Sequence, residues 1–170
     1  AVERTNRGGT PRFSDSRGGA FYIERDASGE WSPSQSLPAP MRNRGDEFGE
    51  DVAVSGDLIV VGSPNVDVFG TNGVGAVDVF RRAEDGWIHE QRIDSPILSG
   101  SFNQFGTGVA CGEGLVAVSA PRNAGGVVFL YQFSGQSWDL IDELRPPGLP
   151  ADALFGREIT IDGDTLITSA

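Results

Sequence analysis

The sequence predicts an all-β protein built from short antiparallel strands. Glycine and proline are frequent, with 24 Gly and 10 Pro among 170 residues, and the apolar residues fall in short runs between them. This pattern is typical of many strands joined by turns. Three sequence markers also recur in one order along the chain, which indicates repeated structural units. The length is sufficient for one domain with a substantial core.

The first marker is a Phe-Gly pair, whose copies begin 57 and 50 residues apart. The tryptophans are 56 and 51 residues apart, and so are Gly19, Gly75 and Gly126, each of which opens an apolar run. Three independent markers with nearly one period indicate a structural repeat. The positions expected to have structural roles in it are Phe48, Gly49, Phe105, Gly106, Phe155, Gly156, Pro64, Pro121, Trp31, Trp87 and Trp138.

Each Phe-Gly pair is followed by two apolar runs on either side of a short polar turn. The three copies read "EDVAVSGDLIVVGSP" (50–64), "TGVACGEGLVAVSAP" (107–121) and "REITIDGDTLITSA" (157–170). Gly and Asp tolerate the positive φ of tight turns, so each copy predicts a β-hairpin. The run at 58–61 is continuously apolar, which predicts a strand covered on both faces.

A third and a fourth run complete the unit. After Gly19, Gly75 and Gly126, apolar and other residues alternate, which predicts a strand. We expect Phe21, Val77 and Val128 to share one face of it. A polar turn then leads to a tryptophan and a more polar run, "WIHEQRI" or "WDLIDEL", which suits an exposed edge strand.

Four antiparallel strands in roughly 50 residues make one blade of a β-propeller. The order Phe-Gly, Gly-Asp-Leu, Gly-Ser-Pro or Ser-Ala-Pro, Gly-x-Val-x-x-Phe and Trp resembles the FG-GAP repeats of integrin α-subunit propellers and their prokaryotic relatives. The resemblance covers nearly the whole chain. It implies an extracellular or cell-surface protein that binds ligands on the loops of a propeller.

The repeats begin and end out of phase with the chain. We expect residues 1–40 to hold the second half of a blade, 41–98 and 99–148 to be full blades, and 149–170 to hold the first half of a blade. About three blade equivalents fall short of the roughly four to eight that close a ring. The chain is therefore expected to be part of a larger propeller, or to close one by self-association, for example as a two-chain ring of about six blades. The start at Ala1 suggests processing or a piece of a longer chain.

Charge and composition limit the classes of partner that the chain is expected to bind. The net charge is −11, and all 13 basic residues are arginine. Nucleic acid is not expected as a partner, because binding phosphates needs a basic face. No apolar run approaches the roughly 20 residues of a membrane span. With one cysteine the chain forms no internal disulfide.

The resemblance raises the question of calcium. Many FG-GAP repeats hold Ca²⁺ in an Asp-x-Asp-x-Asp-Gly loop between the first two strands. Here that slot is a tight turn such as Asp162-Gly163-Asp164, which offers too few of the 6–8 oxygen ligands that Ca²⁺ takes. We therefore expect no metal site and no cofactor. The longer loop at 65–73 is a candidate binding loop through Asp67 and Asn72.

The tripeptide Arg44-Gly45-Asp46 is the sequence that integrins bind. Asp46 lies two residues before a Phe-Gly pair, where the other units have Asn103 and Ala153. Polar residues are common at this place in the resembled family, so we interpret the tripeptide as scaffold and keep Arg44 and Asp46 as candidate binding positions.

The other reactive side chains have ordinary explanations. His89 is the only histidine, and its repeat equivalents are Leu140 and Pro33, so a surface position is expected. Cys111 aligns with Val54 and Ile161, which predicts a small buried apolar side chain. No catalytic motif is present, so no catalytic residue is assigned.

The function that these observations favour is a non-catalytic binding, adhesion or assembly scaffold. Its protein or glycan ligand is expected on the irregular loops at 3–17, 65–74 and 95–104. Two alternatives stay open: a propeller hydrolase or lyase with carboxylates at the central channel, and a structural subunit of a surface filament or coat.

Overall fold

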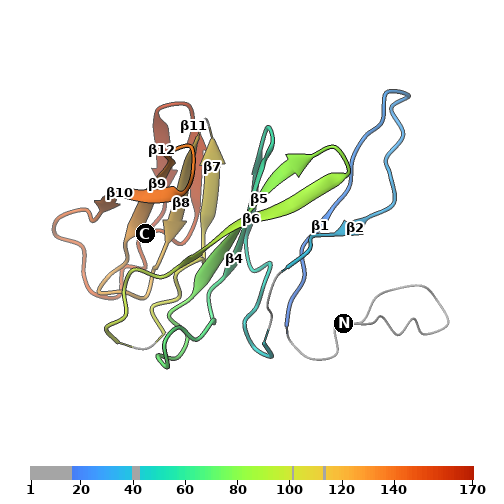
Figure 1. Ribbon diagram of the computed structural model, residues 1–170. Coiled ribbons are helices and arrows are strands. Elements are labelled where there is room, and N and C mark those ends of the chain that lie inside the picture. Colours follow the sequence, from blue (N-terminus) through green and yellow to red (C-terminus); the bar gives the residue numbers. More distant parts are fainter. Residues whose placement is uncertain (1–16, 40–42, 101, 113) are drawn as a thin grey trace.

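The regular structure of the chain is β throughout the part that the computed structural model describes, which is residues 17–39, 43–100, 102–112 and 114–170 (Figure 1). The loop expected at 3–17 lies outside this part except for Arg17. No helix long and apolar enough to cross a membrane occurs in the described residues. The strands are β1 (Phe21–Tyr22), β2 (Gln35–Ser36), β3 (Val52–Ser55), β4 (Leu58–Ser63), β5 (Ala76–Ala83), β6 (Gly86–Asp94), β7 (Val109–Gly112), β8 (Leu115–Ser119), β9 (Val128–Phe133), β10 (Trp138–Leu144), β11 (Ile159–Asp162) and β12 (Thr165–Thr168).

The strands form antiparallel sheets that follow the order of the chain. Strands β3 to β6 make one four-stranded sheet, the first blade, and β7 to β10 make another, the second blade. Strands β1 and β2 form the N-terminal half-blade, and β11 and β12 form the C-terminal half-blade. Four strands in a meander are the arrangement of a propeller blade, so the predicted all-β fold with four-stranded antiparallel blades is confirmed.

Tight turns join the first two strands of the units. Ser55 pairs with Leu58 across a two-residue turn, and Gly56 has a φ of 57° there. Gly163 takes a φ of 54° in the matching turn between Asp162 and Thr165. Glycine adopts these values without steric penalty. Strand β4 is buried along its whole length, as its continuous apolar run predicts.

Successive sheets pack against each other through apolar clusters. One cluster joins the N-terminal half-blade to the first blade, a second joins the first blade to the second, and a third joins the second blade to the C-terminal half-blade. Phe48, Phe105 and Phe155 are buried in these clusters in turn. The phenylalanine of each Phe-Gly pair therefore lies between two sheets, and the core of the protein lies between its blades.

The Phe-Gly pair itself forms a turn of one shape in all three units. The preceding residue, Glu47, Gln104 or Leu154, has a φ between 57° and 59°, and its carbonyl oxygen accepts a hydrogen bond from the N–H three residues later. The glycine has a φ between 92° and 95°. Glycine is the residue that the third position of such a type II turn requires. The repeated Phe-Gly pair is thus explained by backbone geometry.

A second glycine in each unit lies against the Phe-Gly turn of the following unit. The N–H of Phe105 donates to the carbonyl oxygen of Val74 at 2.9 Å, and that of Phe155 to Gly125 at 2.9 Å. A Cβ on Gly75 or Gly126 would lie 2.0 or 2.1 Å from the phenylalanine carbonyl oxygen, which leaves no room for a side chain. These contacts hold neighbouring blades together through their backbones.

This contact corrects the predicted alignment of the N-terminal half-blade by one residue. The glycine that bridges Phe48 is Gly18, not Gly19. Ala20 is then the equivalent of Val77 and Val128 and is buried, whereas Phe21 lies on the opposite face and is exposed. A shift of one residue moves every side chain of a strand to the other face.

The three tryptophans share a repeat position but not an environment. Trp87 packs against Tyr22 of the N-terminal half-blade, and Trp138 packs over Arg81 of the first blade. Each buried tryptophan therefore contacts the sheet before its own. Trp31 has no preceding sheet in the described residues and is 67% exposed.

Candidate functional site

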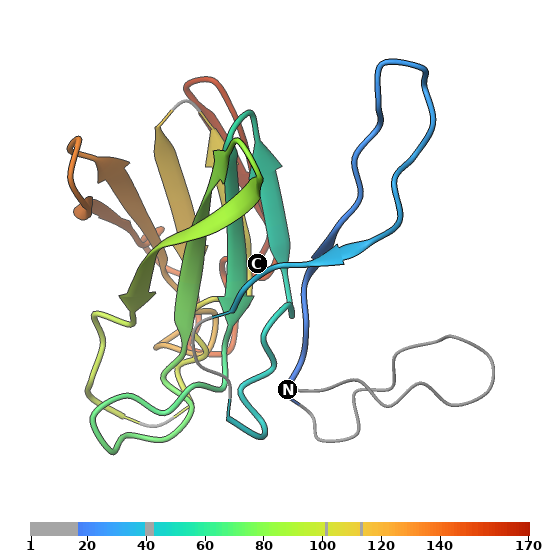
Figure 2. The same cartoon turned by 45° about the vertical axis from the view of Figure 1, so that its right-hand side comes forward.

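Two irregular loops meet at one end of the blades. Residues 65–74 connect β4 to β5, and residues 95–104 connect β6 to β7; both lie at the lower end of the views in Figures 1 and 2. The N–H of Phe102 donates to the carbonyl oxygen of Asn72 at 2.9 Å, and that of Gln104 to Gly73 at 3.2 Å. The two loops therefore form one surface, which we call the loop face.

Two phenylalanines stand out of the loop face. Phe69 is 87% exposed and Phe102 is 56% exposed. Both have left-handed backbones, with φ of 50° and 61°. This region is uncommon for a bulky residue, and such strain is concentrated at binding and catalytic sites. The loop face thus presents aromatic side chains to solvent at a local cost in free energy.

The predicted binding residues of the first loop have supporting roles in it. The Asp67 side chain is exposed, and its Oδ1 accepts a hydrogen bond from the N–H of Gly73 at 2.8 Å. Asn72 is exposed, and its carbonyl oxygen receives the Phe102 N–H. No group of three or more His, Cys, Asp or Glu residues that could hold a metal ion occurs in the described part of the chain.

Calcium is expected to leave the stability of the protein unchanged. Asp67 already satisfies a backbone N–H of its own loop, and Ca²⁺ needs several more oxygen ligands than this loop brings to it. Thermal unfolding in EDTA and in millimolar Ca²⁺ should give coincident curves. A rise in melting temperature of several degrees with Ca²⁺ would reveal a metal site.

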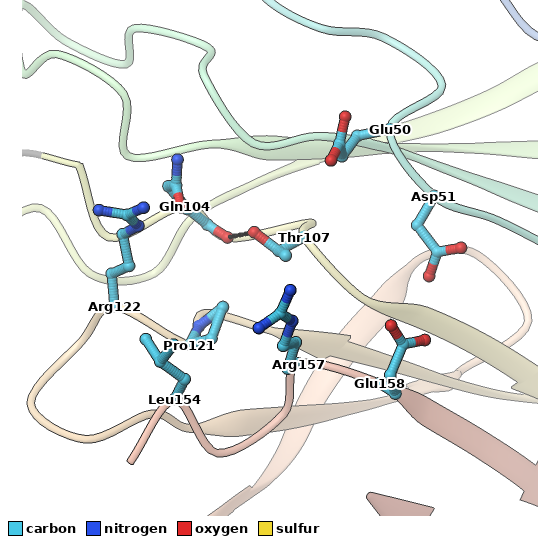
Figure 3. Close-up of a pocket in the computed structure, with 9 residues that line it drawn as sticks. All are labelled: Glu50, Asp51, Gln104, Thr107, Pro121, Arg122, Leu154, Arg157 and Glu158. Carbon is cyan, nitrogen blue, oxygen red and sulfur yellow. Dashed lines mark hydrogen bonds between the residues drawn. The ribbon is translucent and has the colours of Figure 1, made fainter. Parts of the chain in front are cut away.

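A polar pocket of about 380 Å³ lies beside the Phe-Gly turns, where both blades and the C-terminal half-blade meet (Figure 3). Residues that lie far apart in the sequence line the pocket, and each of these three units contributes some of them. The lining residues are Glu50, Asp51, Gln104, Thr107, Pro121, Arg122, Leu154, Arg157 and Glu158. Gln104 also donates to the side chain of Asn65 at 3.4 Å, which connects the pocket to the loop face.

The charged side chains of this pocket differ in the hydrogen bonds and ion pairs that they form. Asp51 is held by two backbone groups: its Oδ1 accepts from Val52 N–H at 2.9 Å and its Oδ2 from Val109 N–H at 2.8 Å. It therefore ties the first blade to the second. Arg122 and Arg157 form no ion pair with any side chain in the described residues. Both arginines line the pocket.

Asp46 of the Arg44-Gly45-Asp46 segment has a structural role. Asp46 is buried, and its Oδ2 accepts a hydrogen bond from the Asn43 N–H at 2.6 Å. Asn103, at the same place in the next unit, is also buried and donates to the carbonyl oxygens of Ser99 and Gly100. These side chains brace the loop that leads into the Phe-Gly turn. Arg44 is exposed beside them.

His89 differs from the expected surface histidine. Its Nε2 lies 2.8 Å from Oδ1 of Asp78, whose side chain is completely buried. Burial raises the pKa of Asp78, and the nearby Arg92 and His89 oppose that rise. The alternation of the strand predicted no ionic group inside β5. Asp78 lies in the packed interior of the first blade, and the partly exposed His89 also contacts the ring of Phe80.

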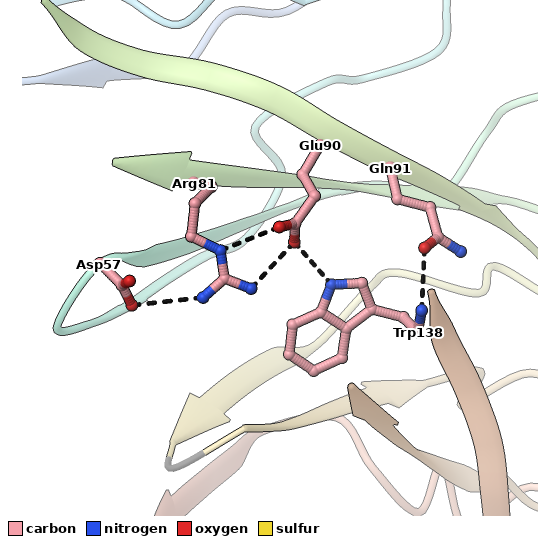
Figure 4. Close-up of polar contacts among 5 residues, drawn as sticks. All are labelled: Asp57, Arg81, Glu90, Gln91 and Trp138. Atoms are coloured by element: carbon pink, nitrogen blue, oxygen red, sulfur yellow. Dashed lines mark hydrogen bonds and ion pairs between the residues drawn. The ribbon is translucent and has the colours of Figure 1, made fainter. Parts of the chain in front are cut away.

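A polar network crosses from the first blade to the second (Figure 4). The guanidinium of Arg81 donates to both oxygens of Glu90, at 2.9 and 3.1 Å, and to Asp57. Glu90 also accepts from the Trp138 indole N–H at 2.9 Å, and Gln91 accepts from its backbone N–H. Burial alone would raise the pKa of Glu90, but the hydrogen bonds from Arg81 and Trp138 outweigh it and lower that pKa. The network links the two blades through the buried Trp138, whereas Asp57 at its edge is exposed.

Cys111 is buried in the cluster between the two blades, as its apolar repeat column predicts. Burial raises the pKa of its thiol to about 11. The side chain is therefore a neutral thiol near pH 7 and packs as a small apolar group.

Comparison with known proteins agrees with these features. No curated protein sequence matches the chain. Residues 31–80 match the family model described as FG-GAP repeat. The matched segment holds the first Phe-Gly turn, the hairpin of β3 and β4, and Gly75 at the entrance to β5. The chain therefore carries an FG-GAP repeat over residues 31–80, in a fold whose four-stranded antiparallel sheets are those of propeller blades.

Proposed function

We propose that the protein is a non-catalytic binding scaffold of the cell surface or extracellular space, and that it takes a protein ligand on the loop face. FG-GAP repeats in blades of this type indicate a protein-binding fold. The observation that carries the proposal is the pair of exposed phenylalanines, Phe69 and Phe102, on two loops that are hydrogen-bonded to each other.

Exposed aromatic side chains are the groups that contribute most to protein interfaces. A few such anchors usually supply most of the binding free energy, and they gain it by leaving water. The loops that carry Phe69 and Phe102 are already hydrogen-bonded to each other, which reduces the conformational freedom that they lose on binding. The neighbouring polar pocket supplies Arg122 and Arg157 as donors for the rim of the same interface.

A second candidate function, a hydrolase or lyase, rests on the carboxylates of the polar pocket. Glu50, Asp51 and Glu158 all line it. Asp51, however, accepts backbone hydrogen bonds with both of its oxygens and so serves to position the second blade. The arrangement favours binding over catalysis.

Replacing Phe69 and Phe102 together by serine is expected to weaken ligand binding by about 30-fold or more, since two aromatic anchors are worth at least ~2 kcal/mol. Peptides selected from a displayed library on the wild-type protein serve as the probe, and their affinities for the double variant are measured by calorimetry. Ile88→Ser is the matched control, because Ile88 is an exposed apolar residue of β6 outside the loop face. Equal affinity for the wild type and the double variant would refute the proposal.

A further inference from the structure

The two arginines of the polar pocket occupy positions where the repeat does not require a charge. The residue after each Phe-Gly pair is Glu50, Thr107 or Arg157, so the fold accepts an acid, a hydroxyl or a guanidinium there. The residue after the proline that follows the second strand is Asn65 in the first blade and Arg122 in the second. The positive charges of the pocket therefore need an explanation other than the fold.

The junction between the two blades has an uncharged pair at the equivalent place. There Gln104 Nε2 donates a hydrogen bond to Asn65 Oδ1 at 3.4 Å. One unit later, Arg122 stands in the place of Asn65, and Leu154 stands in the place of Gln104. A leucine side chain has no polar atom, so the hydrogen bond between side chains of neighbouring units has no counterpart at this position.

The lining residues give the pocket a basic and an acidic end. Figure 3 shows Arg122 at one end and Asp51 and Glu158 at the other, with Arg157 between them. The side chains of Pro121 and Leu154, which also line the pocket, lie between the two arginines in this view. The basic end thus combines two guanidinium groups with an apolar surface.

We propose that this basic end binds a carboxylate group, which Arg122 and Arg157 hold together. The planar fork of N–H donors on a guanidinium matches the two oxygens of a carboxylate, and the hydrogen bonds between them are charge-assisted. The pocket volume of about 380 Å³ lies in the range of small-ligand sites. The apolar surface of Pro121 and Leu154 contacts the carbon chain that carries the carboxylate.

The acidic end of the pocket selects a carboxylate over a phosphate. Glu50, Asp51 and Glu158 line the same pocket and repel any anion that enters it. This repulsion grows with the charge of the ligand, and a phosphate ester carries nearly two negative charges at pH 7 whereas a carboxylate carries one. The site is therefore built for a monoanion.

Two sources supply this chemistry, namely a free small acid and an acidic side chain of a protein ligand. The second source rests on the proposed function, because the hydrogen bond between Gln104 and Asn65 connects the pocket to the loop face. The carboxylate and its two arginines are the same in both cases.

An NMR titration of the arginine Nε–H signals of the ¹⁵N-labelled protein, at low ionic strength, tests the proposal. The probes are butyrate and the peptide acetyl-Ala-Asp-Ala-amide. We expect both to shift the signals of Arg122 and Arg157 and to saturate with a dissociation constant on the order of 1 mM. Acetyl-Ala-Asn-Ala-amide, which has no charge, and inorganic phosphate should each bind at least about 10-fold more weakly. Tighter binding of the aspartate peptide than of butyrate assigns the site to a protein ligand, and the reverse order assigns it to a small acid.

Three variants test the residues of the site. Arg122→Gln and Arg157→Gln should each weaken the binding of butyrate by about 10-fold, since each removes charge-assisted hydrogen bonds. Leu154→Glu should abolish it, because the new carboxylate competes within the pocket. Glutamate fits this backbone, since Glu47 occupies the same place of the repeat with a φ of 57° against 59° for Leu154. Arg25→Gln is the matched control: Arg25 is exposed in the hairpin of β1 and β2, outside the pocket, and its loss should leave the affinity unchanged.

Circular dichroism verifies that each variant is folded. Any of three results would overturn the proposal: no saturable shift of the two arginine signals with butyrate or the aspartate peptide, wild-type affinity in the variants at positions 122, 157 and 154, or phosphate binding as tight as that of butyrate. The titration reports on the two arginines and not on Phe69 or Phe102. A negative result here is therefore distinct from a failure of the peptide-affinity test of the loop face.

Discussion

Replacing Phe105 by alanine is expected to destabilise the protein by about 3–5 kcal/mol, the range for a fully buried aromatic side chain. Phe105 is inaccessible to solvent between the two blades. Its ring lies edge to face with Phe129 and Tyr131, at centroid distances of 5.6 and 6.3 Å. Truncation removes these contacts and leaves a cavity between two sheets that the backbone contact at Gly75 keeps from closing.

Chemical denaturation of the wild type and the variant measures this loss. Phe69→Ala is the control, since the same truncation at an 87% exposed side chain is expected to change the free energy of unfolding by less than about 0.5 kcal/mol. A loss below about 1 kcal/mol for Phe105→Ala would mean that the aromatic position of the repeat is not part of the core.

Replacing Gly75 by alanine is expected to prevent the two blades from docking. The added Cβ would lie 2.0 Å from the carbonyl oxygen of Phe105, and Gly75 has a φ of 90°. Neither the turn nor the strand can move without breaking the hydrogen bond from Phe105 to Val74. We expect a loss of more than about 4 kcal/mol, or failure to fold.

The Gly70→Ala variant measures the cost of the left-handed backbone alone, without the steric clash that Gly75→Ala adds. Gly70 has a φ of 82° and no atom within 4 Å of its added Cβ, so only the left-handed conformation is penalised, by about 1–2 kcal/mol. The difference between the two variants, measured by denaturation, reports the close approach of the blades. Equal losses would show that Gly75 is needed only for its φ.

The repeat could be predicted from the sequence because the backbone geometry of each unit requires glycine at fixed positions. A turn with positive φ and a contact without room for a Cβ both demand glycine, at Gly106 and Gly75 for example. Such demands recur in every unit and appear directly as a period in the sequence. The hairpin turns and the continuous apolar strand β4 follow from local pattern for the same reason.

Features that depend on what packs against a strand were not predictable. Phe21 follows Gly19 as Val128 follows Gly126, and only the contact of Gly18 with Phe48 reveals the shift of one residue. Trp31 matches its column in type but lies where the described chain has no preceding sheet. The alternation of β5 gave no reason to expect a buried Asp78 with His89 beside it.

The candidate site was predictable in place but not in composition. Loop length and irregularity identified residues 65–74 and 95–104, and both form the loop face. The polar candidates there, Asp67 and Asn72, have supporting roles, whereas Phe69 and Phe102 were missed. An aromatic residue in a polar loop was the available signal. The polar pocket had no signal, because its residues come from separate units that only the fold brings together.

Hydrogen exchange on the wild type and the Phe105→Ala variant tests most directly whether the Phe-Gly phenylalanine belongs to the interface between blades. Strands β4 and β5 lie on one side of Phe105, and β8 and β9 lie on the other. If the two blades form one cooperative unit through this side chain, the amides of all four strands should lose protection together in the variant. Loss confined to the second blade, with β4 and β5 as slow as in the wild type, would contradict the account.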